Sequence, residues 1–223
     1  PDQTNPFAIP TYIEQNKLFE VFRESENWSE ILGFHTVGML NEIILEKQGP
    51  DVIRIAEGLH EKKVAQIADI IATRKTEIRI IMIAGPSSSG KTTFAQRLRT
   101  QLLVNGIRPF SISLDDYFVD REHTPLDESN EPDFEHIEAI DLRLFNQHLM
   151  RLIDGEVVEI PKFNFTTGMR EYNGNTIKLK ADQLLIIEGI HGLNEQLTRS
   201  IPRNQKYKIY RSEEHTSELQ SRH

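Results

Sequence analysis

The chain has 223 residues, of which 38% are hydrophobic and 27% charged, and its formal net charge is −8 at pH 7. This composition excludes a disordered chain, and the acidic balance argues against broad nucleic-acid binding, which needs a basic surface. There is no cysteine, which excludes disulfides, a thiol nucleophile and cysteine-bound zinc. Because no run of about 18 apolar residues and no signal peptide are visible, we expect a cytoplasmic protein without a membrane-spanning helix.

The first part of the chain is predicted to be mainly helical. Residues 1–10 are expected to be an irregular lead-in, and residues 11–76 a small α+β region. Residues 36–45 have the pattern of a helix, and Asp51 is the predicted N-cap of a helix that runs to Arg74. No phosphate loop and no cluster of catalytic residue types occur here, so we interpret the region as an accessory one.

The most informative stretch is residues 78–93, where an apolar, strand-like run leads into Gly-Pro-Ser-Ser-Ser-Gly-Lys-Thr-Thr. The pattern Gly-x4-Gly-Lys-Thr between a strand and a helix is typical of a phosphate-binding loop; the alternative is an ordinary Gly/Ser connection. In such a loop, backbone N–H groups point at phosphate oxygens, Lys91 lies near the β- and γ-phosphates, and the Thr92 hydroxyl can ligate Mg²⁺. The predicted nucleotide-binding residues are Gly85, Ser87, Ser88, Ser89, Gly90, Lys91, Thr92 and Thr93.

Strands and helices are then predicted to alternate, which indicates an α/β fold with a parallel sheet covered by helices. Strands are expected at 78–84, 108–114, 184–187 and 206–210, and helices at 91–104, 138–153 and 193–198. Residues 156–180 are predicted to form short strands or hairpins with a turn at Asn173-Gly174.

Two of these strands end in acidic residues, Asp115 and Glu188. The carboxyl ends of parallel strands meet at one edge of a sheet, here next to the phosphate loop. A carboxylate in that place can hold Mg²⁺ or accept a proton from an attacking hydroxyl, although strands also end in polar residues without any function. Two such carboxylates favour phosphoryl transfer from ATP or GTP, with Thr92, Asp115 and Glu188 as the predicted metal ligands.

Five motifs follow one another in a fixed order, at residues 85–93, 112–118, 134–141, 161–165 and 187–190. Together they resemble the uridine kinase and phosphoribulokinase family of P-loop kinases, over about residues 78–210. The resemblance implies a three-layer P-loop fold. It also implies Mg²⁺-dependent transfer of the γ-phosphoryl group of ATP or GTP to the 5′-hydroxyl of a nucleoside such as uridine or cytidine.

The resemblance also implies roles for single residues. Asp115 corresponds to the catalytic aspartate that takes the proton of the acceptor hydroxyl, and Lys91 acts with it. Glu188 corresponds to the acidic residue that helps to hold Mg²⁺. The implied substrate-binding residues are Glu135, for ribose hydroxyls, with Phe118, Phe163, Phe165 and Arg170. Core packing is an equal alternative for the three phenylalanines, and an exposed hairpin position for the arginine.

The chain departs from the family pattern in two ways. Uridine kinases have a base-reading histidine two residues before the arginine that matches Arg170, and this chain has Gly168 there. Neither His136 nor His191 is an obvious replacement, so the acceptor base is left open. The family's arginine-bearing lid is expected after residues 206–210 and is absent from this chain, so we expect weak nucleotide binding and poor turnover.

Residues 28–41 and 56–65 resemble the additional domain beside the editing site of threonyl-tRNA synthetases. That editing site uses histidines and a cysteine, whereas this region has His35 and His60 and no cysteine. We therefore predict a region without hydrolytic chemistry, with His60 on the side of its helix rather than in a metal site.

The predicted organisation is a lead-in at 1–10, an accessory region at 11–76, a kinase domain at 77–210 and a non-native tail at 211–223. The tail resembles the translation of a short-read sequencing adapter; the alternative is a genuine polar tail.

Two classes of function are weighed. The first is a kinase of a small, nucleoside-like acceptor, with ribulose 5-phosphate or another sugar or small alcohol as alternative acceptors. The second is an RNA-associated regulatory NTPase that binds RNA through Lys62-Lys63 or Arg74-Lys75, which the acidic balance opposes. A GTPase switch is not supported, because no Asn-Lys-x-Asp motif occurs. No membrane or nucleic-acid partner is expected, and self-association into a homo-oligomer is left open.

Overall fold

The computed structural model describes residues 16–211 and 216–219. The predicted lead-in at 1–10 and most of the predicted tail lie outside the described residues. The contacts divide the chain into two compact units, Pro1–Glu57 and Gly58–His223. The division into an accessory region and a kinase domain near residue 77 stays a prediction.

The first unit is helical in its described part. It holds α1 (Asn16–Leu32), α2 (Val37–Leu45) and the start of α3 (Gly49–Thr73). The predicted helix at 36–45 is confirmed, and the Thr36 side chain caps it by accepting a hydrogen bond from the N–H of Met39 at 3.3 Å. The prediction of Asp51 as an N-cap is wrong. The helix begins at Gly49, because Pro50 fits a first turn without needing an N–H partner, and Asp51 lies inside that turn.

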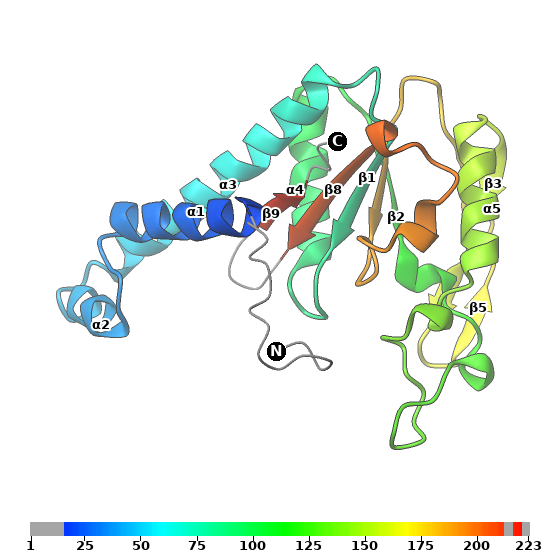
Figure 1. Cartoon of the computed structure of the whole chain (residues 1–223), viewed down its shortest axis with the longest axis horizontal. Helices are drawn as coiled ribbons and strands as arrows, with labels where there is room; N and C mark the ends of the chain where they lie inside the picture. The colour runs from blue at the N-terminus through cyan, green and yellow to red at the C-terminus, as the bar shows by residue number, and fades with distance from the viewer. Residues whose placement is uncertain (1–15, 212–215, 220–223) are drawn as a thin grey trace, which may run out of the picture. The chain divides into compact units, whose positions relative to one another are not determined.

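The second unit contains a five-stranded sheet in the order β2-β7-β1-β8-β9 (Figure 1). Its strands are β1 (Ile80–Ala84), β2 (Phe110–Ser113), β7 (Leu185–Glu188), β8 (Lys206–Arg211) and β9 (Thr216–Leu219). The first four pair in parallel, as predicted, and β9 is antiparallel to β8. The carboxyl ends of β1, β2 and β7 therefore share one edge of the sheet.

Helices cover both faces of this sheet. The helices α4 (Lys91–Val104) and α5 (Leu142–Ile153) lie on opposite faces (Figure 1). All five side chains of β1 are buried, since a parallel sheet between two helical layers has no solvent face. The α/β class is therefore confirmed.

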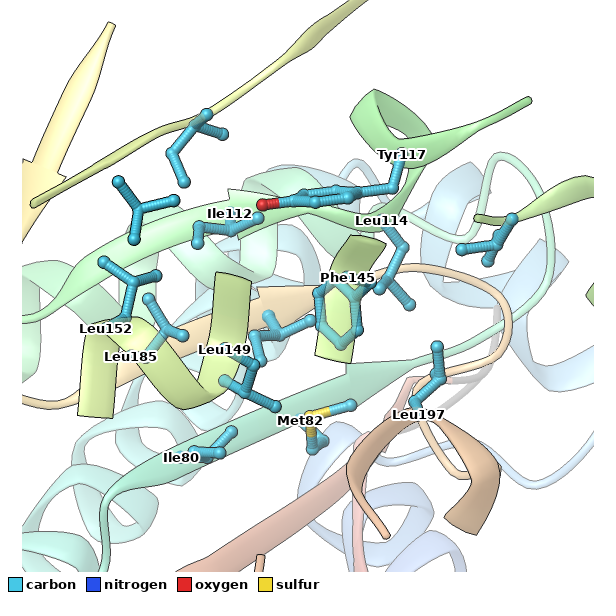
Figure 2. Packing of buried hydrophobic residues seen from close by; sticks show 14 of the residues in the cluster. Ile80, Met82, Ile112, Leu114, Tyr117, Phe145, Leu149, Leu152, Leu185 and Leu197 are labelled. Atoms are coloured by element: carbon cyan, nitrogen blue, oxygen red, sulfur yellow. The ribbon is translucent and has the colours of Figure 1, made fainter. Parts of the chain in front are cut away.

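Successive side chains of β1 point alternately into the core on the α5 side and into the core on the α4 side of the sheet. Ile80 and Met82 pack with Phe145 and Leu149 of α5, and Figure 2 shows these side chains converging with Tyr117. The alternate residues of β1 pack with α4 on the other face. The period of two along the strand thus separates the two cores.

The C-terminal half of α3 belongs to the α4-side core. Val64, Ile67, Ala68 and Ile71 are at most 1% exposed and lie in one cluster with α4 side chains. Polar contacts join the same two helices: Gln101 donates to Glu61 at 2.6 Å and Asn105 donates to Asp69 at 2.8 Å. The outer layer on this face is therefore made by two helices.

His60 lies on the side of α3, where it contacts Arg97 of α4. Its Nδ1 is 3.1 Å from an Arg97 Nη1, and burial, followed by the charges of Arg211 and Arg97, lowers its pKa. Because Arg97 donates, the imidazole accepts and is neutral. This arrangement agrees with the prediction that His60 lies on the side of its helix.

Four short strands form two nested ribbons. They are β3 (Val157–Glu159), β4 (Lys162–Asn164), β5 (Met169–Glu171) and β6 (Thr176–Lys178). The strand β3 pairs with β6, and β4 pairs with β5. Asn173-Gly174 therefore lies in the connection from the inner to the outer ribbon and is not the hairpin turn that was predicted. The hairpin turn is at residues 165–168, with Gly168 at φ 70°.

Two predicted helices are shorter than expected. The helix expected at 138–153 is a 3₁₀ turn at Ile137–Ala139 followed by α5, whose N-cap Asp141 accepts from the N–H of Leu144 at 2.9 Å. The helix expected at 193–198 is a 3₁₀ turn at Glu195–Thr198. Among the helices described, none is both long and apolar enough to cross a bilayer.

Candidate active site

The phosphate loop connects the end of β1 to the first turn of α4. Within it, Ser88 and Gly90 have φ values of 61° and 78°. Left-handed residues among right-handed ones turn successive N–H groups toward one point, which makes an anion-binding concavity. The positive end of α4 faces the same point, because the helix begins at Lys91. The loop thus has the bend that the sequence predicts.

Three details of the loop fit a phosphate ligand. A Cβ at Gly85 would overlap the backbone oxygen of Arg211 and lie 2.8 Å from Ser89 Oγ, so only glycine fits there. The Ser89 hydroxyl is buried and has no hydrogen-bond partner within the described residues. Lys91 Nζ donates to the oxygen of Pro86 at 2.7 Å. A phosphate in the loop would offer acceptors to both side chains.

Thr92 and Glu188 meet across the sheet edge. The Thr92 Oγ1 donates to Glu188 Oε1 at 3.0 Å, although the two residues are 96 positions apart in the sequence. They meet because β7, which ends in Glu188, is the neighbour of β1, and β1 leads into the loop and α4. The predicted pair of metal ligands is therefore in contact.

Asp115 lies in a 3₁₀ turn at Leu114–Tyr117, directly after β2. Burial raises its pKa, the nearby Glu188 carboxylate raises it further, and Lys91 acts in the opposite direction. A carboxylate that interacts with both Glu188 and Lys91 lies in the same electrostatic neighbourhood as the phosphate loop. The three charged residues that the sequence predicts as a group are thus brought together.

Gly189 lets the two carboxylates approach. In the parallel register, Ser113 of β2 is opposite Glu188 of β7, so the residues that follow each strand leave the sheet side by side. A Cβ at Gly189 would lie 2.7 Å from the Cβ of Leu114, the residue before Asp115. The close packing of Gly189 against the Leu114 side chain depends on the absence of a side chain at position 189.

The ligand set fits Mg²⁺ held jointly with a nucleotide. Thr92, Asp115 and Glu188 offer only oxygen atoms, which Mg²⁺ prefers. No group of three or more His, Cys, Asp or Glu side chains that could hold a metal occurs in the described part of the chain. Mg²⁺ typically takes one or two carboxylates and completes its shell with phosphates and water, so such a group is not needed. A cation would also relieve the repulsion between Asp115 and Glu188.

Four phenylalanine rings in mutual contact lie in the region predicted to bind the acceptor, which is called the acceptor side below. Phe118 and Phe163 are only 4% and 2% exposed and belong to the core, with ring centroids 5.5 Å apart. Phe165 is 56% exposed and meets Phe163 edge-on at 5.0 Å. Phe134 joins the cluster at 5.1 Å from Phe118. No role for Phe134 was predicted from the sequence, although it precedes Glu135 in the motif at residues 134–141. Phe165 alone among the three predicted phenylalanines presents a ring to solvent.

Asp116 is a second residue that sequence reasoning missed. Its carboxylate is 2.9 Å from Lys162 Nζ and accepts from the N–H of Phe163 at 3.4 Å. It therefore joins the turn that carries Asp115 to the β4 strand. The two consecutive aspartates, Asp115 and Asp116, were visible in the sequence. The sequence does not tell which of the two carboxylates faces the phosphate loop and which faces β4.

Arg170 is held in an ion pair. Its Nη1 is 3.1 Å from Asp141 Oδ2, and its backbone N–H donates to Asp120 Oδ1 at 3.0 Å. Arg121, which was not predicted, lies over the hairpin turn instead. It donates to the oxygen of Phe165 at 2.7 Å, and a Cβ at Gly168 would lie 2.9 Å from Arg121 Cβ. Gly168 is the position at which uridine kinases have a histidine. The Arg121 side chain therefore lies against this position.

Glu135 lies on an exposed loop that Asp133 shapes, because Asp133 Oδ1 accepts from the Glu135 N–H at 2.8 Å. His191, three residues after Glu188, lies close to this loop. Burial lowers the pKa of His191, while hydrogen bonding with the backbone of Glu135 and His136 acts in the opposite direction. His191 thus connects the loop of Glu135 to the segment that follows β7.

Residues 80–210 match the family described as Phosphoribulokinase / Uridine kinase. The chain belongs to this family. A uridine kinase of Vibrio vulnificus strain YJ016 is 30% identical over 131 residues, which are 58% of this chain and 61% of the relative. A uridine kinase of Staphylococcus aureus strain JH9 is 33% identical over 122 residues, 55% and 57% of the two chains.

A solved structure supports the fold of this family member. A possible uridine kinase from Bacillus stearothermophilus superposes with a TM-score of 0.55 at 24% identity, covering 67% of this chain and 79% of the other. This similarity confirms the P-loop kinase fold. The chain spans 61% and 57% of the length of the two uridine kinases named above.

Proposed function

We propose that this protein is a Mg²⁺-dependent kinase that transfers the γ-phosphoryl group of ATP or GTP to the 5′-hydroxyl of a nucleoside. The observation that carries the proposal is the convergence of Asp115, Glu188 and Lys91 beside one phosphate loop. Phosphoryl transfer needs positioned phosphates, a place for a metal and a group that takes the acceptor proton. Residues that can serve each of these needs lie at one edge of the sheet.

Each residue has a defined part in this reaction. The backbone N–H groups of residues 85–92 hold the phosphate oxygens, and Lys91 exchanges the oxygen of Pro86 for a phosphate oxygen. Thr92 and Glu188 would hold Mg²⁺, which neutralises phosphate charge when bound. Asp115 accepts the proton of the attacking hydroxyl, and its raised pKa brings it closer to the proton affinity that a general base needs.

A nucleoside is the proposed acceptor because the acceptor side combines an aromatic surface with a carboxylate. The exposed ring of Phe165 can stack with a base, and the buried rings of Phe118 and Phe163 support it from below. The exposed carboxylate of Glu135 can accept hydrogen bonds from ribose hydroxyls. The uridine kinases among the relatives support the same class.

A panel of acceptors tests the proposal. Uridine, cytidine, adenosine and ribulose 5-phosphate are each offered with Mg-ATP or Mg-GTP, and the phosphorylated product is measured. We expect slow but measurable turnover, with a pyrimidine nucleoside as the acceptor. Asp115→Asn should lower the rate by about 10²–10⁴-fold, the usual effect of removing a general base, while Mg-ATP binding measured by calorimetry changes by only about twofold.

Two outcomes would contradict the proposal. Turnover of ribulose 5-phosphate or another small alcohol without any turnover of nucleosides would show that the protein is a kinase but that its acceptor is not a nucleoside. Equal loss of nucleotide binding and of turnover in Asp115→Asn would remove the role of Asp115 as the base.

A further inference from the structure

A pocket of about 590 Å³ lies at the edge of the sheet opposite the phosphate loop. Its lining comes from the segments that enter the sheet: Arg79 immediately precedes β1, Arg108 lies two residues before β2, and Gln183 lies two residues before β7. Because these strands are parallel, their amino ends share one edge, and the phosphate loop follows the other end of β1. The pocket is therefore separate from the candidate active site.

The lining of this pocket is strongly basic. Four cationic side chains contribute to it, Lys75, Arg79, Arg108 and Lys180, against a single carboxylate, Asp182. This concentration of positive charge stands out in a chain with a net charge of −8. Like charges gathered around one pocket repel each other, so a cluster of this kind is most stable when an anion is bound.

None of the four cations has an ion-pair partner within residues 16–211. The nearby carboxylate of Glu77 is 3.1 Å from Arg74 and is therefore already paired. The Nε of Arg79 is buried and finds no acceptor in the same range. A buried guanidinium nitrogen without an acceptor is costly, which indicates an acceptor that comes from outside the chain.

We propose that this pocket binds a small phosphorylated anion of about the size of a nucleotide. The volume lies within the 300–1,000 Å³ that is usual for small-ligand sites. The two arginines offer planar donor pairs that match phosphate oxygens, and the two lysines add charge around them. A concave pocket suits a compact polyphosphate better than an extended RNA, which needs a charged surface many nucleotides long.

The family match does not account for the whole site. It begins at residue 80, whereas Lys75 and Arg79 precede that residue. The proposal also goes beyond the proposed kinase function, because it concerns binding of an anion at the far edge of the sheet and does not require phosphoryl transfer.

The test uses the full chain with Lys91→Ala, which weakens anion binding at the phosphate loop. Inorganic tripolyphosphate is titrated into this protein without metal at about 0.1 M salt, where the Debye length is about 10 Å, and binding is followed by calorimetry. We expect one binding event, and an Arg108→Glu/Lys180→Glu pair added to the same protein should weaken it by about tenfold or more, because two donors become repulsive. Raising the salt concentration should weaken binding as well.

The matched control is an Arg143→Glu/Lys62→Glu pair, which makes the same change in net charge at two exposed residues of α5 and α3 outside the pocket. It should change the affinity by no more than about twofold, since distant surface charges are screened. Thermal melting followed by circular dichroism checks that every variant is folded. If the glutamate pair in the pocket is unfolded, Arg108→Gln/Lys180→Gln replaces it.

Three outcomes would overturn the proposal. The first is the loss of all tripolyphosphate binding with Lys91→Ala alone. The second is an equal loss of affinity in the pocket variant and in its control. The third is binding of a 20-nucleotide RNA, lost in the pocket variant, by a protein that does not bind tripolyphosphate, because the partner is then nucleic acid. None of these outcomes depends on kinase activity.

Discussion

The phosphate side of the candidate site and its acceptor side are built in different ways. The phosphate side is one continuous loop together with carboxylates that adjacent parallel strands place, so backbone geometry fixes it. The acceptor side collects side chains from separate segments, among them the turn after β2, the loop at Glu135 and the β4–β5 hairpin. Contacts between side chains hold those segments together.

This difference separates what the site shares with other enzymes from what is specific to it. Backbone N–H groups bind the phosphates of any nucleotide and change little when side chains change. The shape of the acceptor side depends on single residues. At Gly168, for example, the Arg121 side chain occupies the space next to the glycine. We therefore expect substitutions on the phosphate side to affect the rate, and substitutions on the acceptor side to affect the choice of acceptor.

Among substitutions that leave the predicted catalytic side chains in place, the largest effect is expected from Gly189→Ala. The new methyl group would overlap Leu114 and shift Asp115 relative to Glu188. A displacement of about 1 Å in a catalytic group can cost about 10²-fold in rate, so we expect a loss of that size in kcat. Gly58→Ala is the control, because it lies in α3 with no atom within 4 Å of the new methyl and should leave kcat unchanged. Similar rates for both variants would show that the packing at Gly189 is not needed.

Two phenylalanine substitutions test the acceptor side. Phe165→Ala should raise the KM for the nucleoside by about tenfold with little change in stability, because the ring is the proposed contact for the base and is more than half exposed. Phe163→Ala should instead lower the free energy of unfolding by about 3–5 kcal/mol, because that ring is buried. Steady-state kinetics and urea unfolding measure the two effects. A KM unaffected by Phe165→Ala would exclude this ring as the base contact.

Removal of an ion pair that belongs to neither the phosphate side nor the acceptor side should affect stability but not the reaction rate. Lys206, whose side chain is 4% exposed, lies 3.0 Å from the half-exposed carboxylate of Glu195, and Lys208 lies at 2.7 Å from it. Glu195→Gln leaves Lys206 buried without its charge partner. Because solvent screens part of the interaction, we expect a loss of about 1–2 kcal/mol at pH 7 in urea unfolding, with an unchanged rate.

The same pair makes a pH prediction. Hydrogen bonds from Lys208 and Lys206 lower the pKa of Glu195 from 4.5 to about 2. Its contribution to stability is therefore complete above pH 4.5 and is lost as the pH falls toward 2. The difference between wild type and Glu195→Gln should shrink over this range. A difference that is the same at pH 7 and pH 2 would contradict the ion pair.

The smallest effect is the change in stability that we expect from the raised pKa of Asp115 in the metal-free protein. Burial and Glu188 raise this pKa, so the carboxylate is less favourable in the folded state than in the unfolded state. Ionisation of Asp115 therefore costs stability as the pH rises, and Asp115→Asn should slightly stabilise the chain at pH 7 but not at low pH. Glu188→Gln should lower the pKa of Asp115, measured by carboxyl-carbon NMR. A pKa that does not move would contradict their proximity.

The sequence predicted the phosphate side better than the acceptor side for a physical reason. A loop motif and strand ends are local signals, and parallel pairing then brings Asp115 and Glu188 to one edge. Asp116 and Arg121 depend on partners that are more than 40 residues away, the Lys162 side chain and the backbone oxygen of Phe165. No local pattern specifies such pairs. The turn at Asn173-Gly174 was misread for a similar reason, because the strand pairing decides what the turn connects.

The α4-side core has a practical consequence for truncated versions of this protein. Residues matching the family begin at 80, yet one of the two helices that shield the sheet on this face ends at Thr73. A gene trimmed to the matched range would yield a polypeptide that exposes Phe94, Leu98 and Leu102 to water, and we expect it to precipitate during expression. A soluble minimal version should keep the chain from about Gly58 onward.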